Sequence, residues 1–142
     1  MIVENRLYPD AGQIAHLQDE ASPDGPIVMV NLLKFREKAQ YPDGRDAHLS
    51  GREAYMRYGM EVAKLVEASG GRILFAGNVT FLTIGAAEEL WDEVVLVEYP
   101  SRAAFLRMAM SPEWRAIEVH REAGLEGQLN IETVPLMREF GR

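Results

Sequence analysis

The chain has 142 residues, a formal net charge of −7 and no cysteine. The length favours a single domain that can bury a hydrophobic core. The acidic balance argues against nucleic acid and anionic membranes as partners, since phosphate binding needs a basic face. The absence of cysteine excludes disulfides, thiolate catalysis and cysteine metal sites. Met1 is not followed by a signal-peptide pattern, and no stretch approaches ~18 uncharged apolar residues, so we expect a soluble cytoplasmic protein.

The sequence pattern predicts one domain, residues 1–142, made of a helical extension at 1–25, a core at 26–134 and a tail at 135–142. In the extension, Asp10 and Gln13 have the spacing of a capping box. They predict a short helix, which the SPDGP segment ends. The core opens with IVMVNLLKF, whose nearly continuous apolar and β-branched residues predict a buried strand from Ile27 to Phe35.

A polar loop follows, and the next helix begins at Ser50, which can cap it while Glu53 reaches back to the cap. Apolar and aromatic residues then recur at spacings of three and four, the pattern of a helix that packs on a core. The pair Gly70-Gly71 ends this helix in the usual C-terminal way. The stretch from 72 to 85 is long for one strand, and Gly77 within it suggests a bulge or bend.

A short strand from Glu93 to Tyr99 leads into two helical pieces. Ser101 caps the first. At Ser111-Pro112-Glu113 a cap, an N-terminal proline and an acid in the first turn start a new helix with its own axis. Gly124 stands where a left-handed C-cap belongs. The alternating segment from Gln128 to Val134 predicts the last strand.

This element order is β-α-β-β-α-β after a first helix, which predicts a ferredoxin-like α+β fold. Its four-stranded antiparallel sheet would carry the helices on one face. In the predicted strands the odd and the even positions, which point to opposite faces of the sheet, are both apolar. Something must therefore cover the second face. A second copy of the chain is the simplest cover and predicts a homodimer. The N-terminal helix or the long loop is the alternative cover.

The stretch VEYPSRAAFLRMAMSPEWRAIEVHREAGLE resembles the signature of the family called domain of unknown function 1330. GGR before the second strand and NLLKF at the end of the first are also similar to that family. The resemblance covers Pro26 to Val134. It implies a dimeric α+β barrel and no particular reaction. The long loop from Arg36 to Leu49 departs from the shorter members of the family.

His120 is the candidate for chemistry, because histidine can act as a general acid or base near neutral pH. It borders the inward side of its predicted helix, and we expect a neutral imidazole that faces a cavity. The adjacent Arg121 can hold a carboxylate through two hydrogen bonds. The alternative is structural: His120 would cap a backbone carbonyl, and Arg121 would pair with an acid on the surface or on a second copy.

Three further residues are candidates for ligand binding. Asn31 is a carboxamide inside an apolar strand, and its hydrogen bonds must be met by a ligand or by a neighbouring strand. Tyr55 and Tyr58 lie on the inner stripe of their helix, where their hydroxyls can point into a cavity or mark the wet edge of the core.

No metal or cofactor is expected. The three histidines, His16, His48 and His120, have no paired spacing, and no glycine-rich phosphate loop follows a strand. Two functions remain open: a module that binds a small, largely apolar organic molecule, or a cofactor-independent oxygenase, isomerase or cyclase that uses His120 as acid or base. The enzyme reading requires His120, Asn31 and Tyr58 to meet in one pocket.

Overall fold

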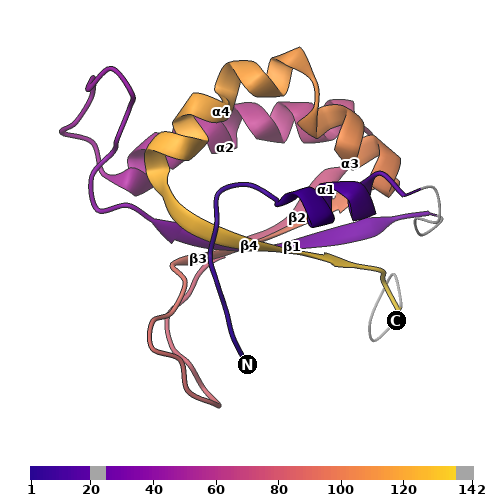
Figure 1. Cartoon of the computed structure of the whole chain (residues 1–142), viewed down its shortest axis with the longest axis horizontal. Coiled ribbons are helices and arrows are strands. Elements are labelled where there is room, and N and C mark those ends of the chain that lie inside the picture. Colours follow the sequence, from indigo (N-terminus) through magenta and orange to yellow (C-terminus); the bar gives the residue numbers. More distant parts are fainter. Residues whose placement is uncertain (20–24, 137–142) are drawn as a thin grey trace.

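The computed structural model describes residues 1–19 and 25–136. The predicted tail lies outside this range from residue 137 on, as does most of the SPDGP segment. The elements, drawn in Figure 1, are α1 (Ala11–Leu17), β1 (Ile27–Phe35), α2 (Gly51–Ala68), β2 (Arg72–Asn78), β3 (Glu93–Tyr99), α3 (Arg102–Ala109), α4 (Pro112–Gly124) and β4 (Leu125–Thr133).

The four strands form one antiparallel sheet in the order β2-β3-β1-β4. Helices α2, α3 and α4 lie on one face of it, as Figure 1 shows. This arrangement confirms the predicted ferredoxin-like fold. The face toward the helices carries the buried residues of β1, among them Ile27, Met29 and Leu33.

The predicted helix starts are confirmed by their hydrogen bonds. Both Asp10 and Ser50 head complete capping boxes, and Ser101 accepts from the N–H of Ala104. Ser111 accepts from the N–H of Trp114 over 3.1 Å, with proline at the first helical position. These bonds satisfy backbone donors that a helix start otherwise leaves without partners.

Gly124 corrects one prediction, because its φ angle is not positive and the chain runs from it straight into β4. The glycine is needed for a close approach instead. A Cβ at Gly124 would lie 2.4 Å from the carbonyl oxygen of Gly51, and one at Gly51 would lie 2.1 Å from that of Arg36. The backbones of α2 and α4 therefore touch where α2 begins and α4 ends. The left-handed glycine after a helix is Gly70, with φ +87°.

The second strand also differs from expectation. It ends at Asn78, and its irregularity lies between Ile73 and Phe75, which leaves Leu74 as the extra residue. Gly77 has another role: a Cβ there would lie 2.5 Å from the ring of Phe75. The missing side chain gives that ring a place to lie against the strand.

The long loop between β1 and α2 packs at the end of the helix layer. Ala39 and Tyr41 are buried against Ala54 of α2 and Ala123 of α4. The N–H of Gln40 donates to the carbonyl of Ala123 over 2.9 Å. This loop therefore covers the ends of two helices, and the described part of the chain does not place it on the outer face of the sheet.

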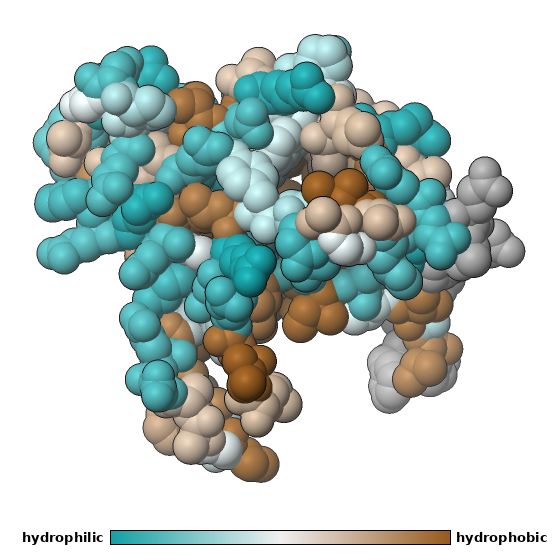
Figure 2. Space-filling model, in the orientation of Figure 1, coloured by the Kyte–Doolittle hydropathy of each residue, from teal (hydrophilic) through white to brown (hydrophobic). Residues whose placement is uncertain are grey.

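The outer face of the sheet is apolar, as predicted from the odd and even positions of the strands. Val30 pairs with Leu96 on one side and Ile131 on the other, and Leu96 pairs with Phe75, so one apolar row crosses all four strands. Phe75 and Ile131 are 54% and 47% exposed. Figure 2 shows the molecule hollowed below the sheet, with brown, apolar atoms in the roof of the hollow. Neither of the two segments proposed as an internal cover lies over this row within the described residues.

We expect Ser111→Ala to lower the free energy of unfolding by about 0.5–2 kcal/mol, as lost helix N-caps do. The change removes the acceptor for the N–H of Trp114 and leaves the fold otherwise intact. Urea unfolding monitored by circular dichroism measures it. An unchanged midpoint would show that this cap does not stabilise the start of α4.

Candidate functional site

A cavity of about 1280 Å³ lies between the sheet and the helix layer. Its walls include residues where the helices pack directly on the sheet, Val66 and Met108 against Met29 and Val97. Its lining is mostly apolar and aromatic and includes Met29, Val95, Val97, Val62, Phe105 and Trp114. The N-terminal segment from Glu4 to Gln18, which includes α1, forms one wall.

Four aromatic rings form another wall of the cavity. Phe35 and Tyr55 have ring centroids 5.3 Å apart, as have Tyr55 and Tyr58, and the ring of Trp114 follows at 6.4 Å. The indole N–H of Trp114 donates to the hydroxyl of Tyr58 over 3.0 Å. Burial raises the pKa of both tyrosines, so their hydroxyls stay protonated at neutral pH. Among the residues that the structure describes, none forms a hydrogen bond with the hydroxyl of Tyr55.

Polar groups cross the floor of the cavity in one directed chain. Asn31 donates from Nδ2 to the carbonyl of Val95 over 3.2 Å, and its Oδ1 accepts from Nε2 of Gln128 over 3.1 Å. The Oε1 of Gln128 accepts in turn from Nη2 of Arg121 over 2.8 Å. The carboxamide of Asn31 is thus satisfied by a neighbouring strand and by Gln128, and the chain ends on a guanidinium.

That guanidinium is the buried charge of the cavity. Arg121 is 8% exposed, and its Nη1 has no hydrogen-bond partner among the described residues. The ring of Tyr8 lies over it, with its centroid 5.3 Å from Cζ. Two acids of the same helix lie at Tyr8 instead of pairing with Arg121: the hydroxyl of Tyr8 donates to Glu122, and Glu118 lies 3.5 Å from that hydroxyl.

The N-terminal segment is held by hydrogen bonds along its length. Arg6 exchanges two backbone hydrogen bonds with Gln128 at the outer edge of β4, 3.1 and 2.9 Å long. The hydroxyl of Tyr8 bonds to Glu122 of α4. Near the end of α1, the carbonyl of His16 accepts from Nη1 of Arg102 over 3.4 Å. The segment therefore bridges from the edge of the sheet to the helices and closes that side of the cavity.

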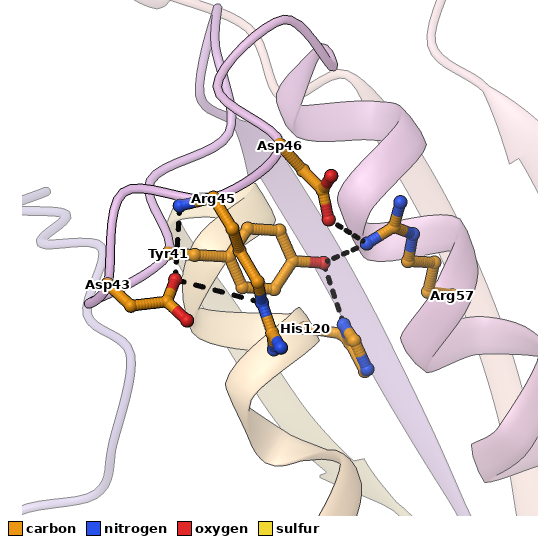
Figure 3. Close-up of polar contacts among 6 residues, drawn as sticks. All are labelled: Tyr41, Asp43, Arg45, Asp46, Arg57 and His120. Carbon is orange, nitrogen blue, oxygen red and sulfur yellow. Dashed lines mark hydrogen bonds and ion pairs between the residues drawn. The ribbon is translucent and has the colours of Figure 1, made fainter.

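His120 lies outside this cavity, in a separate polar cluster on the loop side of α4 (Figure 3). Its Nδ1 is 2.7 Å from the hydroxyl of Tyr41, and that hydroxyl also accepts from Nη1 of Arg57 over 3.2 Å. The same Nη1 pairs with Asp46 over 2.9 Å. Because arginine only donates, the hydroxyl of Tyr41 accepts from Arg57, and its own proton is available to Nδ1 of a neutral His120.

Loss of hydration holds the pKa of His120 below its usual value, and the nearby guanidinium groups of Arg57 and Arg45 act in the same direction. Asp46 and Glu61 oppose the shift. The expected neutrality of His120 agrees with this direction, while its expected place in the cavity is wrong. The physical reason is that the Arg36–Leu49 loop places Tyr41 against the side of α4 that carries His120. There the hydroxyl of Tyr41 is hydrogen-bonded to the imidazole.

The structure thus brings together four of the five predicted site residues: Asn31, Tyr55, Tyr58 and Arg121 all line the cavity, and His120 does not. Gln128 was not predicted as a site residue, because its place in an alternating strand does not indicate which side chains it contacts. Sequence reasoning also missed Tyr8 and Tyr41, which reach the helices from segments without a periodic pattern. Within residues 1–19 and 25–136, no cluster of acids and histidines could hold a metal, and no helix is long and apolar enough to cross a membrane.

Comparison with known proteins identifies the family. The model of the domain of unknown function DUF1330 matches residues 46–133, so the chain belongs to that family. Two crystal structures of one protein of unknown function from Rhodopseudomonas palustris, the first of its methylated form, are 36% and 34% identical to this chain. Each of the two matches covers 94% of this chain. The first covers 97% of the solved chain with a TM-score of 0.85, and the second covers 99% with a TM-score of 0.83.

A more distant structure shares the fold alone. It is a DABB family protein with a ferredoxin-like fold from Mesorhizobium loti, 18% identical, with a TM-score of 0.51. The match covers 80% of this chain and 100% of that one. A search of curated proteins found no match.

We expect His120 to titrate below pH 6.5, the ordinary value for histidine. Between its lowered folded pKa and 6.5, the unfolded chain binds the proton and the folded chain does not, so stability falls as the pH drops through this range. The stability that the neutral imidazole of His120 contributes is therefore fully present above about pH 6.5. NMR titration of the imidazole gives the pKa, and urea unfolding at pH 7.5 and 5.5 gives the stability.

His120→Gln should flatten this dependence, while His48→Gln, at an exposed position of the loop, should leave it unchanged. A wild-type His120 that titrates at 6.5 or above would contradict the neutral hydrogen bond to Tyr41.

Proposed function

We propose that this member of the DUF1330 family is a homodimeric α+β barrel that binds a small, largely apolar organic molecule between its sheet and its helices. The observation that carries the proposal is the cavity of about 1280 Å³ with its aromatic wall. Ligand pockets are commonly ~300–1,000 Å³, mainly apolar, with a few convergent polar groups that set orientation. This cavity has the room and that composition.

The polar groups favour an oriented ligand over a disordered apolar one. Tyr55 contributes a protonated hydroxyl that has no hydrogen-bond partner within residues 1–19 and 25–136, and Arg121 contributes N–H groups that only donate. Both stand on helices packed against each other, so their positions are set before a ligand arrives. A site built this way selects an elongated apolar molecule with at least one acceptor.

The dimer is supported by the outer face of the sheet. An exposed apolar row across four strands marks an interaction surface when it is contiguous. A second copy related by two-fold symmetry offers the same row in return, so the two faces complement each other.

The alternative function is a cofactor-independent enzyme in which His120 moves a proton. The observation in its favour is the short bond between His120 and Tyr41, with Arg57 on the same hydroxyl. In Figure 3 the other ring nitrogen of His120 points away from the cluster. Because this cluster lies apart from the cavity, a ligand in the cavity and a proton carried by His120 would belong to different sites. The binding function is therefore the better supported of the two.

N-phenyl-1-naphthylamine, a neutral apolar dye, should bind with saturable fluorescence at one site per chain. Gly59→Phe should weaken this binding about tenfold or more, because it puts a ring into the cavity. Gly59 lines the cavity from α2, and a Cβ there meets no atom within 4 Å. Since glycine disfavours helix interiors, the change should not lower stability.

Met60→Phe is the matched control, next in sequence, 65% exposed and not part of the lining. It should bind the dye as the wild type does. If the Gly59 variant also binds like the wild type, the dye does not occupy this cavity and the proposed site is wrong.

Sedimentation at micromolar concentration should give about twice the 16.0 kDa mass of the chain. Phe75→Glu places a charge in the outer apolar row and should shift the species toward monomer. Met60→Glu adds the same charge on the helix side and should not. A stable wild-type monomer would rule out the dimer.

A further inference from the structure

We infer that the ligand of the cavity carries a carboxylate, which Arg121 binds through Nη1. The inference rests on the proposed function and names the chemical class of its ligand. Its starting point is a buried cation: Arg121 is 8% exposed, and no carboxylate among the described residues forms an ion pair with it. Buried charges are normally paired, because removing them from water is costly.

The guanidinium is held in one orientation. Nη2 donates to Gln128, which Asn31 fixes from the other side, and Asn31 is fixed by the backbone of β3. The Tyr8 ring lies against the guanidinium. Each of these side chains is hydrogen-bonded to the next, whereas Nη1 of Arg121 has no acceptor in the part of the chain that the structure describes. An arginine with a purely structural role normally forms an ion pair with an acid, whereas the guanidinium of Arg121 lies in the wall of a cavity.

Nη1 is itself shielded from solvent, so a ligand reaches it only when a neighbouring side chain moves. Tyr8 is the neighbour we expect to move. It precedes α1 in a stretch outside helices and strands, and its hydroxyl bonds to Glu122, a half-buried acid. A carboxylate would then take the place beside the guanidinium that the aromatic ring holds in this structure.

The surrounding charges favour a single negative charge on the ligand. One guanidinium can balance one carboxylate. Glu93 lines the same cavity, and Glu118 and Glu122 lie at the hydroxyl of Tyr8. A doubly charged phosphate would meet these acids, and Arg121 is the buried cation that the described lining offers against them. The other arginines of the lining, Arg6 and Arg52, are exposed.

The test compares three probes with the same naphthalene ring: 2-naphthoate, the neutral 2-naphthamide, which matches it in shape, and 2-naphthyl phosphate. Each displaces N-phenyl-1-naphthylamine at pH 7.5. Wild-type protein should bind naphthoate about 10- to 100-fold more tightly than the amide, the range that hydrogen bonds to a charged group give. The phosphate should bind more weakly than naphthoate.

Arg121→Met should abolish the preference for naphthoate, measured within each variant as the ratio of the affinities for naphthoate and the amide. Its thermal midpoint should not fall, because a buried, incompletely paired cation is replaced by an apolar side chain of similar length. Arg121→Gln keeps a hydrogen-bond donor without the charge and should also lose the preference for naphthoate. If the methionine variant fails to fold, the glutamine variant provides the test.

Equal affinity of the wild type for naphthoate and the amide would overturn this inference while the cavity still binds the dye. Tighter binding of the phosphate would overturn the carboxylate class. A preference for naphthoate that survives in both Arg121 variants would assign the anion to another residue. Failure of the dye itself to bind would instead remove the proposed function, and this inference with it.

Discussion

The helix layer depends on one backbone junction where β1 ends, α2 begins and α4 ends. The N–H of Arg36 donates to the carbonyl of Gly124 over 2.8 Å, and the N–H of Gly51 donates to the carbonyl of Arg36 over 3.1 Å. A Cβ at either glycine would collide with the backbone opposite, so these two positions must be glycine for the segments to meet this closely. The junction fixes the helices to each other and to the sheet at this end, while Val66 and Met108 pack on Ile27 and Val97 of the sheet. The cavity lies between the same helices and strands.

Helix α4 serves two environments with adjacent residues. Consecutive positions on a helix point about 100° apart, and His120 and Arg121 use that step. His120 turns to the loop and anchors it through Tyr41, while Arg121 turns to the sheet and the cavity. The two residues look like one catalytic pair in the sequence. In the structure they have separate neighbours and separate chemistry.

The sequence predicted most of the fold, because its signals are local. Ser50 with Glu53 and Ser111 with Pro112 mark helix starts through bonds that span three residues. It could not predict the role of Gly124, because that role depends on the close approach of Gly51, a residue of another helix more than 70 positions earlier in the chain.

The candidate site was predictable only where residue type and burial gave a signal. Asn31 and the two tyrosines stood out because polar atoms on apolar faces need partners. The partners themselves come from distant segments: Gln128 from the last strand and Tyr8 from the N-terminal stretch. His120 was misplaced because the position of Tyr41 depends on how an irregular loop packs, and no periodic pattern reports that.

The extra residue at Leu74 and the bridge at Arg6 have a joint consequence for how copies of this chain meet. Exposed sheet edges invite further strands, which add one after another and produce fibrous aggregates. Here the irregularity twists β2 at one edge, and the N-terminal segment occupies hydrogen-bonding groups of β4 at the other. Lateral growth is thereby discouraged on both sides, whereas the apolar face stays open. Association through a face ends when two faces have met, so the architecture favours a closed assembly over an open-ended one.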